Sequence, residues 1–106
     1  ESNRYIAFEV MSKQEIKDFQ EVKDAIETEM RYLIGDLGLA KANLQVVKNT
    51  WNPSSQRGII KVERKYQDHV KASLTLIKQI NNKQATLRSL LSSGMINRVK
   101  KLLIGG

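Results

Sequence analysis

The stretch RGIIKVER, residues 57–64, decides the fold expected for this chain. It alternates like a second stretch, RYIAFEVM, residues 4–11, and side chains alternate across the two faces of a β-strand. The face expected to meet the core carries one set of residues: Ile6, Phe8, Val10, Ile60 and Val62. The opposite face carries the other: Tyr5, Ala7, Glu9, Ile59, Lys61 and Glu63. Both stretches are therefore predicted to be strands of one sheet.

The stretch 57–64 also partly matches the sequence signature of the strand with which RNA-recognition domains bind bases. That signature begins with a basic residue and a glycine. Arg57 and Gly58 occupy the first two positions of that signature. Its three aromatic positions hold other residue types: Ile59, Lys61 and Arg64. Base stacking contributes about 1–3 kcal/mol per base, and only Tyr5 on this face could stack. The sheet is therefore not expected to bind RNA through aromatic rings.

A long helix is predicted to follow the first strand. Ser12 is the expected N-cap, and Glu15 three residues later completes a capping-box pattern. Apolar residues at spacings of three and four form one helical face: Ile16, Phe19, Val22, Ile26, Met30, Leu33 and Leu37. Gly35 and Gly38 are predicted to end this helix.

The remaining elements are read from the same patterns. Strands are expected at residues 43–50 and 83–91, and a second helix at residues 66–80, which Asn81-Asn82 ends. Its inward residues are Val70, Leu74, Ile77 and Ile80. A terminal helix begins at a cap provided by Ser92 or Ser93. Its apolar stripe is Met95, Ile96, Val99, Leu102 and Leu103.

This order predicts one α+β domain over residues 1–106, with a core at about 4–91 and a terminal helix at 93–104. The fold class is the ferredoxin-like split βαβ arrangement of RNA-recognition domains. Four antiparallel strands carry two helices on one face, and the first and third strands lie side by side. The terminal helix is expected to bury its stripe on the open face, against Ala7, Ile59 and Leu90.

Charge is distributed unevenly along the chain, whose net charge is +7. Residues 1–36 hold five basic and nine acidic side chains, whereas residues 37–106 hold thirteen basic and two acidic ones. A basic surface of this kind favours a polyanionic partner. The candidate RNA-binding residues, which would contact phosphates, are Arg4, Arg57, Lys61, Arg64, Lys65, Lys71, Lys78, Lys83, Arg88, Arg98, Lys100 and Lys101. A solvated charged surface is the alternative interpretation.

Catalysis by this chain alone is not expected. His69 is the only histidine and there is no cysteine, so no catalytic or metal-binding motif is formed. Trp51 is expected to anchor a turn more than to stack on a base. The second function considered is a ferredoxin-like dimerisation or small-molecule regulatory domain with no role in RNA binding.

Four stretches together resemble the archaeal ribonuclease P protein component 2 family. They are RYIAFEV, GDLGLAKANLQVVK, GIIKVERK and VKASLTLIKQINNKQATLRSLLSSGMINRVKK, and the likeness extends from Arg4 to Lys101. The most specific parts are ASLTL at residues 72–76 and the Ser93-Gly94 pair before the last helix. Met95 departs from the threonine usual after that pair, and the basic N-terminal arm common in the family is missing from this sequence.

The resemblance implies a cytoplasmic, non-catalytic subunit of an endonuclease particle that removes the 5′ leader from precursor tRNA. In that family the RNA is the catalyst and uses Mg²⁺, while the protein itself binds no cofactor. The implied partners are ribonuclease P RNA, the TIM-barrel-like protein component 3 and other protein subunits. A heterotetramer formed through self-association of this subunit is also implied.

Overall fold

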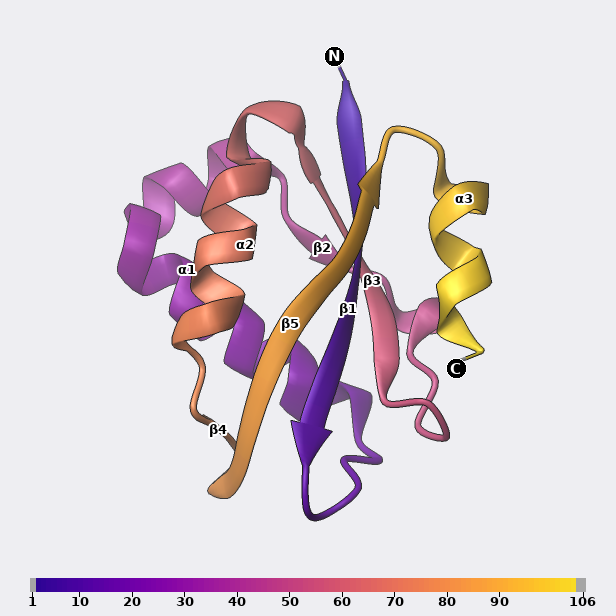
Figure 1. Ribbon diagram of the computed structural model, residues 1–106. Helices are drawn as coiled ribbons and strands as arrows, with labels where there is room; N and C mark the ends of the chain where they lie inside the picture. Colours follow the sequence, from indigo (N-terminus) through magenta and orange to yellow (C-terminus); the bar gives the residue numbers. More distant parts are fainter. Residues whose placement is uncertain (1, 105–106) are drawn as a thin grey trace.

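A computed structural model describes residues 2–104, which fold into one antiparallel sheet between helices (Figure 1). The strands are β1 (Asn3–Ser12), β2 (Gln45–Val46), β3 (Arg57–Glu63), β4 (Gln79–Ile80) and β5 (Lys83–Ser93). The helices are α1 (Phe19–Ala42), α2 (Gln67–Leu76) and α3 (Ile96–Lys100). Single 3-10 turns are η1 (Lys48–Thr50), η2 (Arg64–Tyr66) and η3 (Lys101–Leu103). None of the described helices is long and apolar enough to cross a membrane.

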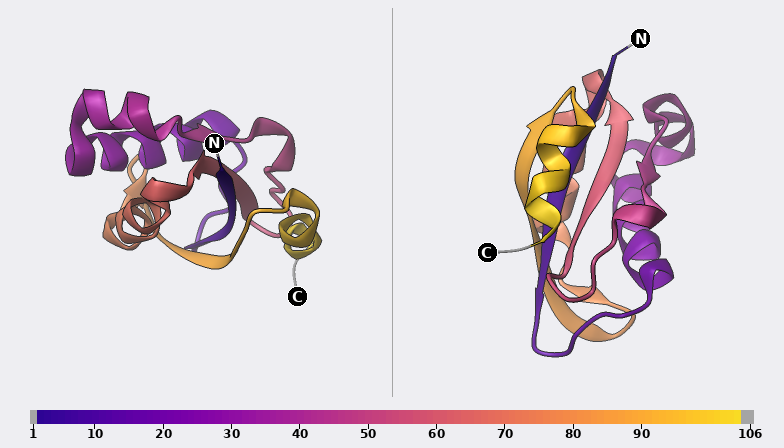
Figure 2. Two further views of the ribbon diagram at one scale, coloured as in Figure 1. Left: turned by 90° about the horizontal axis from the view of Figure 1, so that it is seen from above. Right: turned by 90° about the vertical axis from the view of Figure 1, so that its right-hand side faces the viewer.

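The strand order is β2-β3-β1-β5-β4, so β1 and β3 are neighbours in the middle of the sheet, as predicted. Helices α1 and α2 pack on one face of the sheet, and α3 lies against the other (Figure 2). The mixed α/β fold with an antiparallel sheet is confirmed. The predicted four-stranded sheet is wrong, because the described residues form a sheet of five strands, and the three helices are α1 and α2 on one face and the terminal helix α3 on the other.

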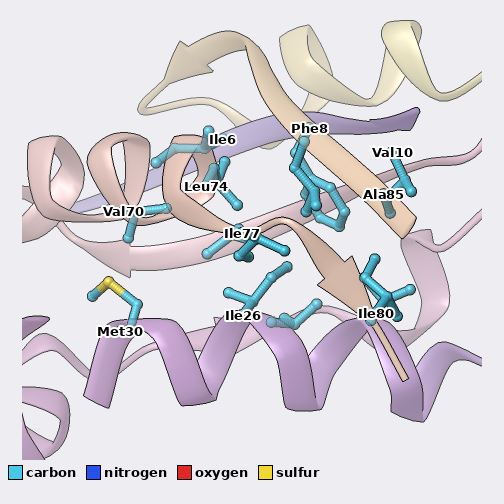
Figure 3. Packing of buried hydrophobic residues seen from close by; sticks show 14 of the residues in the cluster. Ile6, Phe8, Val10, Ile26, Met30, Val70, Leu74, Ile77, Ile80 and Ala85 are labelled. Atoms are coloured by element: carbon cyan, nitrogen blue, oxygen red, sulfur yellow. The ribbon is translucent and has the colours of Figure 1, made fainter. Parts of the chain in front are cut away.

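The main core fills the space between the sheet and the helices α1 and α2 (Figure 3). The expected inward residues of the two central strands, from Ile6 to Val62, are all buried there. Ile26 and Met30 of α1 and Leu74 of α2 pack against them. Alternation along β1 and β3 therefore predicted both faces of the sheet correctly.

The start of α1 was predicted wrongly. Ser12 still belongs to β1, where it pairs with Ala85. The N-cap is Asp18, whose carboxylate accepts a hydrogen bond from the amide of Gln20 at 2.9 Å. Ile16 is fully buried as expected, although it precedes the helix, and the side chain of Gln56 bonds both its N–H and its carbonyl oxygen.

The predicted end of α1 was also wrong, because the helix kinks at Gly35 and continues through Gly38. Gly35 has φ 75° and ψ 174°, which breaks the helical path, and the helix then resumes to Ala42. Ala42 is buried, so the second segment still contributes to the core. Asn43 at φ 50° provides the left-handed C-cap. Leu33 before the kink and Leu37 after it were both expected on the buried face, but both are exposed.

Two expected elements divide into shorter ones. Residues 43–50 hold only the strand β2 followed by η1, where the Thr50 hydroxyl accepts a hydrogen bond from Ile59 N–H at 3.0 Å. The second helix ends at Leu76, and β4 follows it. Asn81 and Asn82 both have positive φ and make the tight turn from β4 into β5. Ile80 is buried as expected, but in a strand.

Gly58 explains why the stretch 57–64 begins Arg-Gly. The rings of Phe8 and Trp51 stack with centroids 6.0 Å apart and planes 14° apart. A Cβ at Gly58 would lie 2.9 Å from Phe8 Cζ and 3.2 Å from Trp51 Cε3. The glycine therefore makes room for an aromatic pair inside the fold, and Trp51 anchors the turn as predicted.

Gly58→Ala is expected to lower the free energy of unfolding by about 1–3 kcal/mol, because the added methyl overpacks the two rings. Urea unfolding followed by Trp51 fluorescence measures this change. Ser54→Ala in the adjacent exposed turn is the control and should unfold like the parent. An unchanged midpoint for Gly58→Ala would contradict the packing described.

Candidate nucleic-acid interface

The outer face of the sheet is covered where an RNA-recognition domain would stack bases. Ala7, Ile59 and Val99 form a second, smaller buried cluster, and all three are fully buried. Leu90 packs there too, at a register shift where β5 opposes Ala7 with Leu91 and Phe8 with Ser89. The prediction that the terminal helix buries its apolar stripe on this face is confirmed. Met95 is the exception, because it is 60% exposed.

The terminal helix begins later than expected. Its N-cap is Met95, which has no side chain that caps the helix. Ser93 contributes from outside, since its hydroxyl accepts a hydrogen bond from Met95 N–H at 3.0 Å. Gly94 is placed under the Arg4 side chain, and a Cβ there would lie 3.1 Å from Arg4 Nη1. The Ser93-Gly94 pair therefore turns the chain between β5 and α3 beneath Arg4.

An arginine–glutamate–arginine cluster also lies on the outer face. Glu9 on β1 lies between Arg57 on β3 and Arg88 on β5, with N–O distances of 3.2 and 2.8 Å. Arg57 Nη1 also donates to the carbonyl oxygen of Leu102 at 2.8 Å. Arg57 thus binds the terminal segment to the sheet, and its side chain is only 15% exposed.

The loop before β3 adds a second attachment for the end of the chain. Asn52 Nδ2 donates to the carbonyl oxygen of Leu103 at 3.0 Å, and the Ser55 hydroxyl donates to the same oxygen. Sequence reasoning missed these roles, because it assigned Arg57 to RNA and expected only a turn at Trp51. Local turn signals give no indication of partners that lie 48 and 51 residues later in the chain.

Two opposing effects act on the pKa of the Glu9 carboxyl. Burial raises the pKa of its carboxyl, while the hydrogen bonds and positive charges of Arg88 and Arg57 lower it. The arginines outweigh burial, and the pKa lies below the ordinary value of 4.5. The carboxylate therefore stays ionised and paired at neutral pH.

Cationic side chains gather where the strands end beside η2. Arg4 lies near the start of β1, and Arg64 and Lys65 follow the end of β3. The backbone joins these segments, since Arg64 N–H donates to the Ser2 carbonyl oxygen at 3.0 Å. Ser92 at the end of β5 bonds the Gln67 side chain at 2.9 Å, which brings the start of α2 to the same place. We call Arg4, Arg64 and Lys65 the strand-end cations.

The terminal segment carries three more cations, on the side of the sheet that α3 covers. Arg98 and Lys100 lie on α3, and Lys101 opens η3; all three are exposed. None of them forms an ion pair with another described residue. Their side chains remain available to a partner.

The remaining predicted residues lie elsewhere. Lys61 is half-buried on β3, opposite Tyr5 and Gln45. Lys71 and Lys78 are on α2 or just beyond it, on the other side of the sheet from α3. Lys83 pairs with Glu21 of α1 at 3.0 Å. The twelve candidate residues therefore divide between two sides of the sheet, and the structure does not bring them all into one surface.

The single histidine of the sequence lies on α2. His69 is exposed and lies against the Tyr66 ring, with centroids 5.3 Å apart. No group of three or more His, Cys, Asp or Glu side chains in residues 2–104 is placed to hold a metal ion.

Comparison with known proteins places the chain in a family. The model of the Rpp14/Pop5 family matches residues 4–104. This chain belongs to the Rpp14/Pop5 family. It is 38% identical to ribonuclease P protein component 2 of Pyrococcus abyssi over 95% of this chain and 83% of that protein. Against the component 2 of Thermococcus gammatolerans it is 37% identical over 95% of this chain and 82% of that protein. The predicted resemblance is confirmed.

A solved structure shares the Rpp14/Pop5 fold seen here. A chain in the cryo-EM structure of yeast ribonuclease MRP superposes with a TM-score of 0.69, covering 90% of this chain and 76% of that one. The two sequences are 12% identical, so this likeness concerns the fold alone.

Val99→Asp is expected to destabilise this Rpp14/Pop5 domain by several kcal/mol, because it buries a carboxylate without a partner. Thermal unfolding followed by circular dichroism checks the effect. Asn97→Asp places the same charge on the exposed side of α3 and should melt like the parent. Equal melting temperatures for the two variants would show that α3 is not docked on the sheet.

Glu9→Gln is expected to remove stability that exists only while the carboxyl is ionised. Because the folded pKa is lowered, that stability is present above about pH 4.5 and is lost as the pH falls through the folded pKa. Urea unfolding from pH 7 to pH 3 should show a difference between parent and variant that shrinks below pH 4.5. Glu15→Gln, at an exposed residue that forms no ion pair within residues 2–104, is the control. A difference that stays constant with pH would contradict the ion-pair cluster.

Proposed function

We propose that this chain is a non-catalytic, RNA-binding subunit of a ribonuclease P particle that removes the 5′ leader from precursor tRNA. The observation that carries the proposal is the match to the Rpp14/Pop5 family over residues 4–104, nearly the whole chain. The proposed partners are ribonuclease P RNA, the protein component 3 subunit and other protein subunits. Self-association into a heterotetramer with component 3 belongs to the same proposal.

The mode of RNA binding is inferred from the side chains that remain exposed around the outer face. Since α3 covers Ala7 and Ile59, bases cannot stack on the middle of the sheet. The exposed cations Arg64, Lys65 and Arg98 are instead suited to phosphates on a folded RNA. Arg offers a planar fork that bonds phosphate in a bidentate way, and Lys offers a point charge.

The proposed RNA surface therefore consists of the strand-end cations and the three cations of the terminal segment. Arg57 and Arg88 are assigned to the cluster around Glu9, and Lys83 to its pair with α1. Neutralising crowded phosphates would lower the Mg²⁺ concentration that the RNA needs to fold. The Mg²⁺ itself is proposed to act on the RNA, and the particle to be cytoplasmic.

Arg64→Ala with Lys65→Ala, or Arg98→Ala with Lys101→Ala, is expected to weaken binding to ribonuclease P RNA without changing thermal stability. Each lost phosphate contact should reduce the slope of log K against log salt by about 0.7–0.9. Filter binding across a salt series measures the slope, and reconstituted cleavage at limiting Mg²⁺ measures the functional effect.

The matched control for this experiment is Lys13→Ala with Lys17→Ala, which removes the same charge. These exposed lysines lie in the loop after β1, at the other end of that strand. If the control weakens RNA binding as much as the two test variants do, the effect is general electrostatics and the proposed surface is wrong. Unaltered activity in both test variants would also reject it.

A further inference from the structure

A groove lies on the side of the molecule away from α3. It runs between α1 and the segment that links α2 to β4, and its volume is about 780 Å³. Apolar side chains from both walls reach it, including Ala25 and Tyr32 of α1 and Leu76 of α2. Tyr32 is 83% exposed and Leu76 is 52% exposed. Exposed large side chains with apolar surface that line a groove are typical of an interaction surface.

The rim of this groove is acidic, in contrast to the +7 charge of the whole chain. Asp18, Glu21, Asp24 and Glu29 line it, with Lys78 as the one cation among its lining residues. Glu21 is occupied by Lys83 and Asn81. Asp24 accepts a hydrogen bond from the neutral Gln20 side chain at 2.8 Å, and neither Asp24 nor Glu29 forms an ion pair with any residue in the described part of the chain. Both carboxylates therefore lack a cationic partner and can pair with cations of another protein.

These charges decide among the possible occupants. An RNA backbone would meet carboxylates there and be repelled. A second copy packed groove to groove by a two-fold axis would place the same carboxylates opposite each other. If the groove bound the basic terminal segment of another copy, every assembly would keep an unoccupied groove at one end. Further copies would then add without forming a closed oligomer. A different protein with cations beside an apolar side chain fits both the charge and the shape.

We propose that this acidic groove docks a basic amphipathic segment of another protein subunit of the particle. Lysine or arginine side chains of that segment pair with Asp24 and Glu29, and an apolar side chain inserts between Tyr32 and Leu76. This inference rests on the proposed function, since it takes the chain to be one subunit among several. It assigns the protein partner to the face opposite α3 and the proposed RNA surface.

The test uses the full chain and the other protein subunits of the particle from the same organism, purified and added one at a time. Isothermal titration calorimetry measures each dissociation constant for the parent and two groove variants. Tyr32→Ser with Leu76→Ser removes the apolar contacts, and Asp24→Lys with Glu29→Lys reverses the charge. For one subunit, both variants are expected to raise the dissociation constant at least tenfold.

The matched control is Glu15→Lys with Glu27→Lys, which changes the net charge equally at carboxylates that do not line the groove. This control should bind that subunit like the parent. The proposal is overturned if no subunit loses affinity for the groove variants, or if the control loses as much. It is also overturned if the groove variants weaken RNA binding or dissociate a self-assembled form of the chain.

RNA affinity measured on the same preparations separates this inference from the proposed function. Loss of subunit binding in the groove variants, with RNA affinity kept or increased, supports the docking site. Parent protein that binds a subunit through the groove but binds no ribonuclease P RNA would contradict the RNA-binding role and leave the docking site intact.

Discussion

Burial of Val99 against Ala7 and Ile59 is the contact on which the rest of the outer face depends. These three residues come from three elements, so the contact joins the end of the chain to both central strands. Once α3 lies there, the open side of the sheet is no longer available for base stacking. Exposed cations then lie around this covered face, among them Arg64, Lys65 and Arg98. A small apolar cluster thereby holds the terminal segment and its positive charges against the sheet.

The ion pairs around Glu9 complete this arrangement. Glu9 holds Arg57 and Arg88 across three adjacent strands, and Arg57 reaches on to the carbonyl of Leu102. An arginine at the start of β3 thus serves the docking of the terminal segment. Removing a charge from such a partly buried cluster differs physically from removing one at an exposed position, because the partner carboxylate would be left without a counter-charge.

The acidic rim of the groove follows from the uneven charge along the sequence. The acidic part of the chain, residues 1–36, supplies most of α1, and α1 forms one wall of the groove that faces away from α3. The basic part, residues 37–106, supplies α2 as well as β3, β5 and α3. A protein partner at the acidic groove and RNA on the α3 side would not compete for the same surface. The two proposals together describe this arrangement.

The sequence by itself determined the two central strands, their buried faces and the covered outer face. Those features depend on local alternation and on an apolar stripe that must be buried. It could not locate the kink at Gly35, because glycine permits both a helix end and a bend, and the burial of Ala42 decides between them. Nor could it tell that Arg57 and Lys83 are already paired, since their partners, Glu9 and Glu21, are 48 and 62 residues away. Only the tertiary structure brings such distant charges together, and so only it decides which cations remain free.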